Sequence, residues 1–483
     1  MRDNQAVTNP DRLSGLDASF LALEERGAHM HVGSVLLFEG EAPVYPDFVA
    51  QLERRLSLVP RYRQKLAFPP LVQSRPVWID DPHFNAGYHV RHTALPHPAG
   101  EHELRRLAGR VFAQQLDRSK PLWELWLVDR VGADRFAIIA KTHHCLVDGI
   151  SGVDVTTVLF DLDREPQSPP ASTESWVPRP EPTRAALLGD ALVERAAGPF
   201  GVARAAAAAA TRPQAALAAG RAALAGVAAL TQAGLGGAPR SPLNVKIGPH
   251  RRFAWVDGDL ATFKAVKNAL GGTVNDVVLA VVAGALRSHF LAHDYDTEAD
   301  LKAMVPVSVR ADSERGALGN KVAAVYAPLP IGLEDPIARF RAVHEAMRGL
   351  KESGQAVGAE TITALADFAP PTILSQAARI QSVQRFFNVT VTNVPGPQFP
   401  LFLLGRQLSR LYPLVPIVEN AALGVAIMSY NARIDFGLVS DYDALPDLDD
   451  LAAALDAAIA ELAGAAGAHG GQRGGRPRAV QRA

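Results

Sequence analysis

The 483-residue sequence contains a single cysteine, Cys145, and carries almost no net charge. One thiol cannot form an internal disulfide or a cysteine-rich zinc site, and this composition suits a reducing compartment. The 49 basic and 50 acidic side chains leave a formal net charge of -1, without the positive excess that nucleic-acid-binding proteins usually carry. We therefore predict no nucleic-acid partner.

The sequence also has no long hydrophobic run. Residues 1–17 lack the apolar stretch of a secretory signal. The best short run, residues 277–286, stops at Arg287, whereas a membrane-spanning helix needs about 20 predominantly apolar residues. We therefore predict a cytoplasmic protein that is not secreted, has no transmembrane helix and contacts membranes only peripherally.

Hydrophobic residues make up 48% of the sequence, enough to form large cores and to exclude wholesale disorder. The length favours two domains, at roughly 100–200 residues each. Residues 1–165 and 241–463 both alternate apolar runs typical of strands with helical patterns. Strands are expected at residues 34–38, 125–129, 136–140, 301–309, 322–329, 387–392 and 421–429, and helices at residues 46–56, 101–115 and 275–288.

Residues 166–240 are expected to connect the two domains. The first part, residues 166–182, contains six prolines, which interrupt regular structure. Residues 184–240 are rich in alanine, the residue with the highest helix propensity, so one or two helices are expected there. A basic membrane-surface helix is the alternative, but Arg204, Arg212 and Arg221 fall at relative angles of about 0°, 80° and 260°, which is no single face. Residues 464–483 are rich in Gly and Arg and are expected to form a disordered tail.

The most informative segment runs from residue 136 to residue 152. An apolar strand leads into His143 and His144, followed by Asp148-Gly149 and a helical pattern. Adjacent side chains on a strand point to opposite faces, so one histidine at most can readily face a given cavity. A neutral imidazole is the usual general base at neutral pH, and Asp148 could orient it or hold the turn. A structural pair of hydrogen-bonded histidines is the alternative.

Other chemistries fit this segment less well. Cys145 could act as a nucleophile with His144 as its base, but its neighbours are apolar and buried thiols are usually inert. His29 and His31 could add metal ligands, but neither HExxH nor CxxC spacing supports a metal site. The sequence contains no GxSxG elbow, P-loop or dinucleotide fingerprint. We therefore predict no metal and no cofactor.

HHxxxDG at residues 143–149 resembles the signature of acyl-CoA-dependent acyltransferases, a superfamily that includes chloramphenicol acetyltransferase and peptide-synthetase condensation domains. Further segments narrow the resemblance to the bacterial wax ester synthase/diacylglycerol acyltransferase family. These segments are residues 16–20, 30–33, 121–124, 248–252, 275–280, 305–310 and 393–397. The resemblance covers about residues 9–460. The sequence departs from the family pattern at Cys145, where a small residue is more usual, and at Asn85, where aspartate is expected.

The resemblance implies an α/β fold of two chloramphenicol-acetyltransferase-like domains. Each would be a mixed β-sheet with flanking helices, and the active-site tunnel would lie between the domains. It implies the transfer of a long-chain fatty acyl group from acyl-CoA to diacylglycerol, and also to long-chain alcohols. Acyl-CoA would be a co-substrate rather than a cofactor. Peripheral contact with the inner membrane or lipid droplets, and a monomer or homodimer, are expected.

The resemblance also implies roles for individual residues. His144 would be the general base, His143 would support it, and Asp148 and Gly149 would order the loop, with Arg310 as a candidate partner of Asp148. Asn275 and Asp276 would approach from the second domain as an oxyanion donor or as structural residues. Pro121, Leu122 and Trp123 would line the substrate tunnel, although packing at the start of a strand would explain Trp123 nearly as well.

The chemistry agrees with these roles. A thioester is already activated, so a base within about 3 Å of the alcohol proton suffices, and no covalent intermediate is needed. Two other functions stay open. One is acyl transfer to a polyketide-type alcohol or a condensation-type reaction, and the other is non-catalytic binding of acyl-CoA or lipid.

Overall fold

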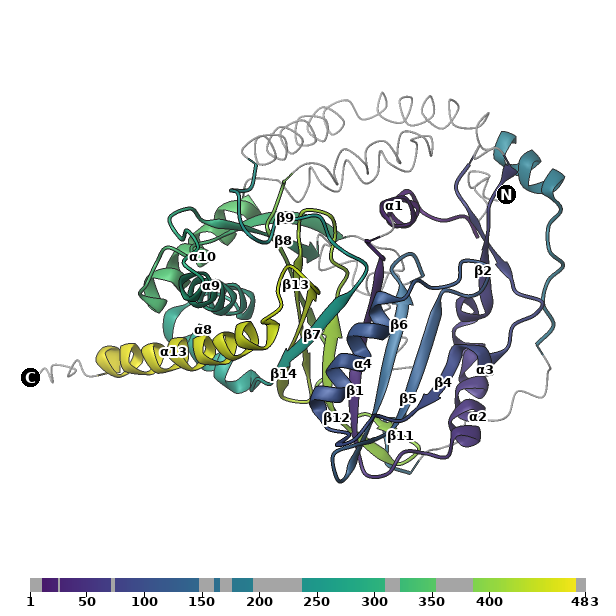
Figure 1. Ribbon diagram of the computed structural model, residues 1–483, viewed down its shortest axis with the longest axis horizontal. Helices are drawn as coiled ribbons and strands as arrows, with labels where there is room; N and C mark the ends of the chain where they lie inside the picture. Colours follow the sequence, from purple (N-terminus) through teal and green to yellow (C-terminus); the bar gives the residue numbers. More distant parts are fainter. Residues whose placement is uncertain are drawn as a thin grey trace, which may run out of the picture.

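Two six-stranded mixed β-sheets organise the molecule in a computed structural model of the chain (Figure 1). The structure describes residues 11–24, 27–70, 74–146, 160–165, 176–193, 237–308, 322–352 and 385–474. Most of the expected connector and the end of the expected tail lie outside these residues. The predicted class, α/β with mixed sheets and flanking helices, is confirmed.

The first sheet has the strand order β11-β12-β1-β6-β5-β4. Its neighbouring strands are antiparallel except for β4 and β5, which are parallel. The three strands predicted in the first half of the sequence lie within β1, β5 and β6. The strands are β1 (His31–Glu39), β4 (Val90–Thr93), β5 (Trp123–Val131), β6 (Arg135–His143), β11 (Phe402–Leu403) and β12 (Arg406–Leu414).

The second sheet has the order β7-β14-β13-β10-β8-β9. Its central strands β13, β10 and β8 run parallel, and the outer pairs are antiparallel. The four strands predicted in this half correspond to β8, β9, β10 and β13. The strands are β7 (Arg251–Val256), β8 (Leu301–Ser308), β9 (Val322–Leu329), β10 (Val389–Pro395), β13 (Leu423–Tyr430) and β14 (Arg433–Asp441).

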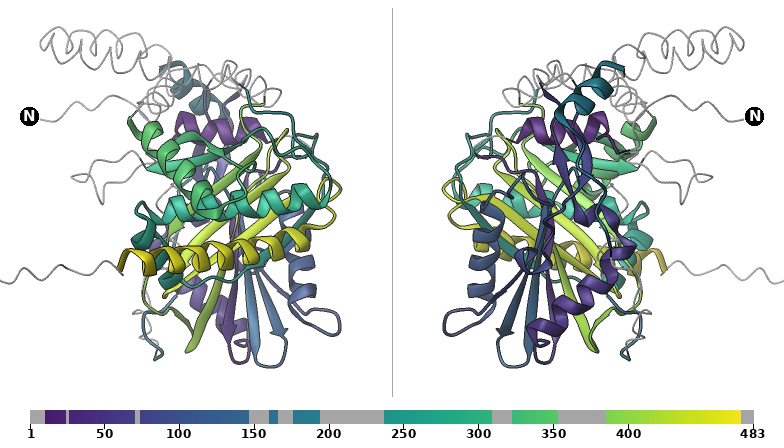
Figure 2. Two further views of the ribbon diagram at one scale, coloured as in Figure 1. Left: turned by 90° about the vertical axis from the view of Figure 1, so that its left-hand side faces the viewer. Right: turned by 90° about the vertical axis from the view of Figure 1, so that its right-hand side faces the viewer.

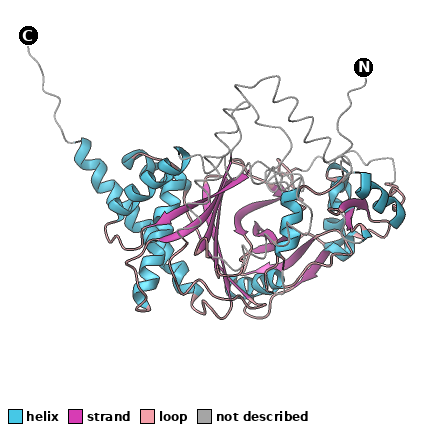
Figure 3. Ribbon diagram, turned by 90° about the horizontal axis from the view of Figure 1, so that it is seen from above, coloured by secondary structure: helices cyan, strands magenta, loops and turns pink. Residues whose placement is uncertain are grey.

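Four helices cover the outer face of the second sheet, and they gather at one end of the molecule in the view from above (Figures 1 and 3). The predicted helix at residues 275–288 lies within α9. The expected start of a disordered tail at residue 464 is corrected, because α13 continues to Gly474 although residues 464–474 are rich in glycine. The helices are α8 (Leu260–Leu270), α9 (Val274–Ala292), α10 (Pro336–Glu352) and α13 (Leu448–Gly474).

Helix α9 corrects one expectation from the sequence. Its 19 residues are long and apolar enough to cross a membrane by length and composition, although no such segment was expected. Its residues 276–286 are all buried, and 72% of its most apolar window is buried inside the molecule. A helix that is apolar on every side is expected in the core of a large domain as well as in a membrane. Here α9 packs against α8, α10 and α13.

Shorter elements surround the first sheet. The predicted helices at residues 46–56 and 101–115 correspond to α2 and α4. Asn85, which stands where aspartate was expected, caps α3 by accepting a hydrogen bond of 2.9 Å from the Gly87 amide. These elements are α1 (Gly15–Leu23), α2 (Tyr45–Arg55), α3 (Ala86–His89), α4 (Glu101–Ala113), the 3-10 turns η1 (Leu56–Leu58) and η2 (Pro60–Arg63), and the strand pair β2 (Gln64–Ala67) and β3 (Val77–Asp80).

The two halves of the chain are joined because the second half contributes two strands to the first sheet. Strand β12 comes from the second half, yet it pairs with β1 in the first sheet, and β11 extends that sheet further. Strand β12 also packs closely against β14, where a Cβ atom on Gly437 would lie 1.8 Å from the Pro413 carbonyl oxygen. The domain bounds 1–165 and 241–463 stay a prediction, but residues 402–414 belong to the first sheet. No sequence pattern indicates which sheet an apolar strand joins.

Gly437→Ala tests this close approach. The new methyl group would collide with a backbone oxygen that cannot rotate away, and overpacking of a core typically costs roughly 1–3 kcal/mol. We expect a lower melting temperature by calorimetry. The matched control is Gly464→Ala on the exposed side of α13, where a Cβ atom meets nothing within 4 Å. That change is expected to stabilise the helix by about 0.5–1 kcal/mol. Equal melting temperatures for the wild type and Gly437→Ala would contradict the packing.

Candidate active site

The backbone of the histidine pair is held at the end of β6 by strands on both sides. His143 is in register with His31 on β1, and its amide donates a 2.9 Å hydrogen bond to the Leu122 carbonyl. The His144 amide donates a 2.7 Å hydrogen bond to the Met30 carbonyl. The structure therefore confirms the strand end that the sequence predicts. Backbone hydrogen bonds hold the chain in place at both histidines.

The side chain of His143 faces protein groups at both ring nitrogens. It is buried, and its Nδ1 accepts a 3.1 Å hydrogen bond from the Cys145 amide. In a neutral ring the hydrogen must then sit on Nε2, which lies 3.5 Å from Glu24 Oε2. Because both nitrogens face protein groups, this ring is suited to a supporting role.

The side chain of His144 lies in a different environment from that of His143. Its ring packs against Phe20 with 4.0 Å between ring centroids, and the residue keeps part of its surface exposed. Its Nδ1 has no hydrogen-bond partner among the residues that the structure describes. Burial lowers the pKa of His144 from 6.5 to about 4, so the imidazole is neutral at physiological pH. It can therefore accept a proton, as a general base must.

Glu24, at the end of α1, forms the centre of a cluster beneath the histidines that the sequence did not reveal. Its side chain is only 1% exposed. Arg118 donates to Glu24 Oε2 through Nε at 3.0 Å and makes a second, shorter contact through its terminal nitrogen. His29 Nδ1 lies 3.7 Å and His31 Nε2 lies 3.6 Å from Oε1, and His143 approaches the other oxygen. We call these five residues the Glu24 cluster.

The Glu24 cluster holds an ionised carboxylate in the interior. Burial alone would raise the pKa of Glu24, but hydrogen bonding by His143, His29 and Arg118 lowers that pKa well below its usual range. Burial, together with the nearby charge of Lys141, lowers the pKa of His31 well below 6.5. His29 and His31, which the sequence offered as possible metal ligands, thus face this carboxylate.

A second buried ion pair also supports β6, on the same face as His143 because Lys141 precedes it by two residues. The Lys141 ammonium, 1% exposed, lies 2.6 Å from Glu124 on β5. It also donates 2.8 Å hydrogen bonds to the carbonyls of Val111 and Gln114 at the end of α4. Burial lowers the pKa of Lys141 despite the attraction of Glu124. These bonds connect β6, β5 and α4 close to the histidine pair.

The environment of Cys145 disfavours a thiol nucleophile. The residue is buried, and burial raises the pKa of its thiol well above 9.0. A thiol is a nucleophile only as the thiolate, and this one stays protonated at physiological pH.

Pro121, Leu122 and Trp123 lie directly beside the histidine pair, at the start of β5. Leu122 is fully buried and Trp123 is 2% exposed. The Trp123 indole donates a 2.8 Å hydrogen bond to the Tyr62 carbonyl, and its ring stacks on His89 at 4.6 Å. The Leu122 carbonyl accepts the His143 amide, so this segment positions the site through its backbone. Its contribution to a substrate tunnel stays a prediction.

Asn275 and Asp276 lie in the first turn of α9. Asp276 forms a capping box with Thr273, with hydrogen bonds of 2.8 and 3.2 Å, and it lies 2.9 Å from His344 on α10. Asp276 is therefore a structural residue of the helix start. Asn275 is partly buried and makes no side-chain hydrogen bond within the described part of the chain.

Three residues of the predicted site lie outside the described residues. Asp148 and Gly149 belong to residues 147–159, and Arg310 to residues 309–321. The order of the HHxxxDG loop and the proposed partner of Asp148 stay predictions.

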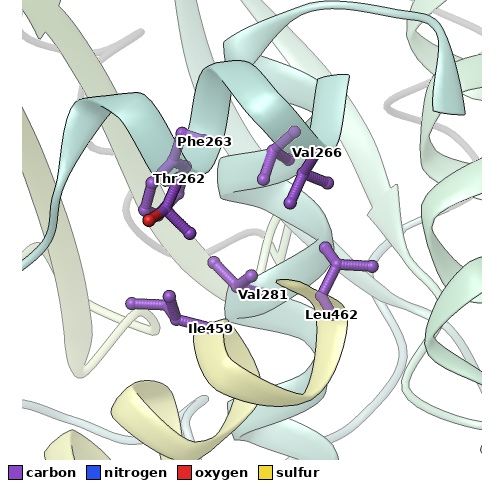
Figure 4. A pocket seen from close by; sticks show the side chains of 7 residues that line it. Thr262, Phe263, Val266, Val281, Ile459 and Leu462 are labelled. Atoms are coloured by element: carbon purple, nitrogen blue, oxygen red, sulfur yellow. The ribbon is translucent and has the colours of Figure 1, made fainter. Parts of the chain in front are cut away.

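The pocket in Figure 4 is not the expected tunnel. It is an apolar crevice between α8, α9 and α13, on the far side of the second sheet from the histidines, and it leaves no room for a water molecule. Its lining includes Thr262, Phe263, Val266, Val277, Val281, Ile459 and Leu462. The active-site tunnel between the two halves stays a prediction.

Comparisons with known proteins bear on the whole chain. Residues 13–278 match the family model of the wax ester synthase/diacylglycerol acyltransferase catalytic domain, and residues 318–463 match the C-terminal domain of the same family. A putative diacylglycerol O-acyltransferase of Mycobacterium tuberculosis is 34% identical over 463 residues, which cover 94% of this chain and 90% of that protein.

Solved structures agree. The wax ester synthase/diacylglycerol acyltransferase from Marinobacter aquaeolei VT8 is 30% identical, with a TM-score of 0.65, and the match covers 94% of this chain and all of that one. The trichothecene 15-O-acetyltransferase from Fusarium sporotrichioides is 11% identical with a TM-score of 0.58, and covers 93% of this chain and 94% of that one. The second likeness concerns the fold alone. Together they confirm the expected acetyltransferase-like arrangement of two domains.

Glu24→Gln tests the Glu24 cluster. The change keeps the size of the side chain but removes the charge that compensates Arg118 and the imidazoles. Removing one partner from a buried ion pair typically costs about 3–5 kcal/mol. We expect a clearly lower melting temperature at pH 7, measured by circular dichroism. Glu53→Gln, on an exposed face of α2, is the matched control and should melt like the wild type.

The pH dependence gives a second readout for the same variant. Because the pKa of Glu24 is lowered on folding, its contribution to stability is complete above the unfolded value of 4.5 and is lost as the pH falls below it. The difference in melting temperature between wild type and Glu24→Gln should therefore be largest near pH 7 and shrink in acid. A difference that does not change with pH would contradict an ionised Glu24.

Proposed function

Because the chain belongs to the wax ester synthase/diacylglycerol acyltransferase family, we propose that it transfers a long-chain fatty acyl group from acyl-CoA to the free hydroxyl of diacylglycerol. The observation that carries the proposal is the division between the two adjacent histidines. His143 has both ring nitrogens directed at protein groups, whereas His144 is neutral and its Nδ1 has no hydrogen-bond partner in the described part of the chain. This leaves one imidazole free to receive a proton.

The reaction proceeds as direct attack within a ternary complex. His144 takes the proton of the acceptor hydroxyl as its oxygen attacks the thioester carbonyl carbon. The tetrahedral intermediate then collapses, the carbon–sulfur bond breaks, and the coenzyme A sulfur takes the proton back from His144. The products are an ester and free coenzyme A, and His144 is neutral again. The thioester is already activated, so neither a covalent enzyme intermediate nor a metal is required.

The developing negative charge on the carbonyl oxygen needs a hydrogen-bond donor. The Asn275 amide or a backbone N–H serves this purpose in the proposal. Asn275 is favoured over Asp276, because the Asp276 carboxylate is already occupied by the helix cap and His344. Asp148 and Gly149 order the loop that follows the base. An interdomain tunnel, lined in part by residues 121–123, excludes water as a competing nucleophile.

Diacylglycerol is the proposed main acceptor, and long-chain alcohols are secondary acceptors. The support is the naming of similar proteins, since the mycobacterial relatives are described as diacylglycerol O-acyltransferases. The similar Marinobacter protein is described as both a wax ester synthase and a diacylglycerol acyltransferase. Both acceptors are lipids, so the proposal includes peripheral contact with the inner membrane or lipid droplets. The protein acts as a monomer or homodimer.

The test is an assay with palmitoyl-CoA, offering diacylglycerol and hexadecanol in parallel and following both free thiol and ester product. We expect ester from both acceptors, with more from diacylglycerol. General-base catalysis typically contributes 10²–10⁴-fold, so His144→Ala is expected to lose at least about 100-fold in rate. Cys145→Ala is the matched control and should keep most of the activity, because the buried thiol takes no part.

Other outcomes would support other functions. Thiol release without ester would mean hydrolysis or a different acceptor, such as a polyketide-type alcohol or an amine in a condensation-type reaction. No turnover, with acyl-CoA binding retained in both wild type and His144→Ala, would indicate a non-catalytic lipid-binding protein.

The pH profile of kcat/KM gives an independent test of the base. This parameter reports groups of the free enzyme, and protonation removes the ability of His144 to act. Burial lowers its pKa to about 4, so activity should persist well below pH 6.5 and fall with an acidic limb near pH 4. Enzyme held at each pH and returned to pH 7.5 controls for unfolding. An acidic limb centred near pH 6.5 would contradict the buried, neutral imidazole.

A further inference from the structure

Two histidines at the end of α9 and an aspartate just before α13 converge on the surface of the helical layer. Helices α9 and α13 lie side by side across the second sheet (Figure 2). Their contacts show that they run antiparallel, because Gly284 lies next to Ala458 while His289 and His293 lie next to Asp447. We propose that His289, His293 and Asp447 bind a divalent transition-metal ion of the zinc type, which fastens the two helices together.

The spacing of the three ligand atoms suits such an ion. His293 Nε2 lies 2.8 Å and His289 Nδ1 lies 3.7 Å from Asp447 Oδ2, and all three atoms lie within 4.8 Å of one another. Zinc bonds of about 2.0–2.1 Å in a tetrahedral site place neighbouring ligand atoms about 3.3 Å apart. The observed distances bracket this value, so small side-chain rotations would complete the site.

The hydrogen bonding of His293 prepares its ring for this role. Its Nδ1 lies 2.7 Å from the His289 carbonyl oxygen and must donate, because a carbonyl can only accept. With Nδ1 donating to this carbonyl, Nε2 is the ring nitrogen left to coordinate an ion, and it is the nitrogen beside Asp447. A metal-binding histidine almost always donates its other N–H to a backbone carbonyl, a carboxylate or a water in this way.

The Asp447 carboxylate faces the two imidazoles through a single oxygen, Oδ2. Asp447 Oδ2 is buried, but it accepts no hydrogen bond in the described part of the chain, despite the close approach of His293 Nε2. A lone pair facing a carboxylate oxygen at this distance is unfavourable unless a proton or a cation lies between them. A metal ion would satisfy the carboxylate and both imidazoles at once, whereas a proton would satisfy one pair.

The surroundings favour a cation. The His289 side chain is only 6% exposed, so the protein interior holds its ring beside the Asp447 carboxylate. Asp447 is 21% and His293 is 36% exposed, which leaves a path from solvent and room for a water as fourth ligand. Two carboxylates, those of Asp447 and Asp450, lie close enough to act on His289, and their negative charge favours a cation here.

The location indicates a structural rather than a catalytic ion. An α-helix rises about 1.5 Å per residue, so the 14 residues from Asn275 to His289 separate the two ends of α9 by about 21 Å. The ion would thus lie far from the start of α9, where the proposed oxyanion donor is found. Its expected effect is on the attachment of α13, and this inference does not depend on the proposed function.

The experiment uses the full chain without a polyhistidine tag, stripped of metal with a chelator. Titration with Co²⁺ is followed by visible absorption, and titration with Zn²⁺ by calorimetry. We expect one equivalent of each ion to bind, with the absorption of a four-coordinate Co²⁺ site. Zn²⁺ should raise the melting temperature, because an ion that binds only the folded state stabilises it, whereas the same concentration of Mg²⁺ should not.

Two variants assign the site. His293→Ala and Asp447→Asn should each weaken binding by at least about tenfold, the lower end of what loss of even an outer-shell partner costs. His102→Ala removes an exposed histidine from α4 and should bind like the wild type. Circular dichroism of the metal-free proteins checks that each variant folds. Absence of stoichiometric binding in the wild type, or equal binding in all four proteins, would overturn the proposal and leave a proton-bridged His293–Asp447 ion pair.

Discussion

The burial of the Glu24 carboxylate constrains the candidate active site more than any other single interaction. A charge removed from water must be compensated by nearby partners. The partners of Glu24 are Arg118 and three imidazoles, those of His29 before β1, His31 at the start of β1 and His143 at the end of β6. Four separate parts of the chain are thereby drawn to one point. His143 becomes part of this compensation, and because His144 follows directly on the same strand end, the Glu24 cluster also determines where His144 can lie.

A second constraint is the path of the chain between the two sheets. Strand β12 comes from the second half of the sequence and pairs with β1, and it also contacts β13 and β14 of the second sheet. Strand β1 is therefore held between β6, which carries the histidines, and a strand supplied by the other half. Any rearrangement of the two halves must act on β1 and so on the floor of the site. The fold couples the halves mechanically at the place where the proposed chemistry occurs.

Much of this could be predicted from the sequence, and the reason for each failure is physical. Short apolar runs located β1, β5 and β6, and a helical pattern located α9. The His143–His144 pair was found because a short motif at a strand end is local information. Glu24 was missed because nothing near it in sequence distinguishes a buried acid from an exposed one, and its partner Arg118 is 94 residues away. The place of β12 in the first sheet was missed for the same reason, since an apolar strand pattern does not indicate which strand it pairs with. Helix α9 is long and apolar enough to cross a membrane, and only the structure shows that its apolar surface is buried in the core instead.

The low pKa of His144 also sets a requirement on the rest of the proposed mechanism. A base with a pKa of about 4 is fully available at neutral pH, but it has little thermodynamic pull on an alcohol proton. Proton transfer must therefore accompany attack on the thioester rather than precede it, so that formation of the new carbon–oxygen bond acidifies the hydroxyl. Stabilisation of the developing oxyanion then carries much of the catalytic burden, and the neutral histidine directs the proton rather than generating a free alkoxide. The same burial that weakens the base excludes water, which would otherwise hydrolyse the acyl donor.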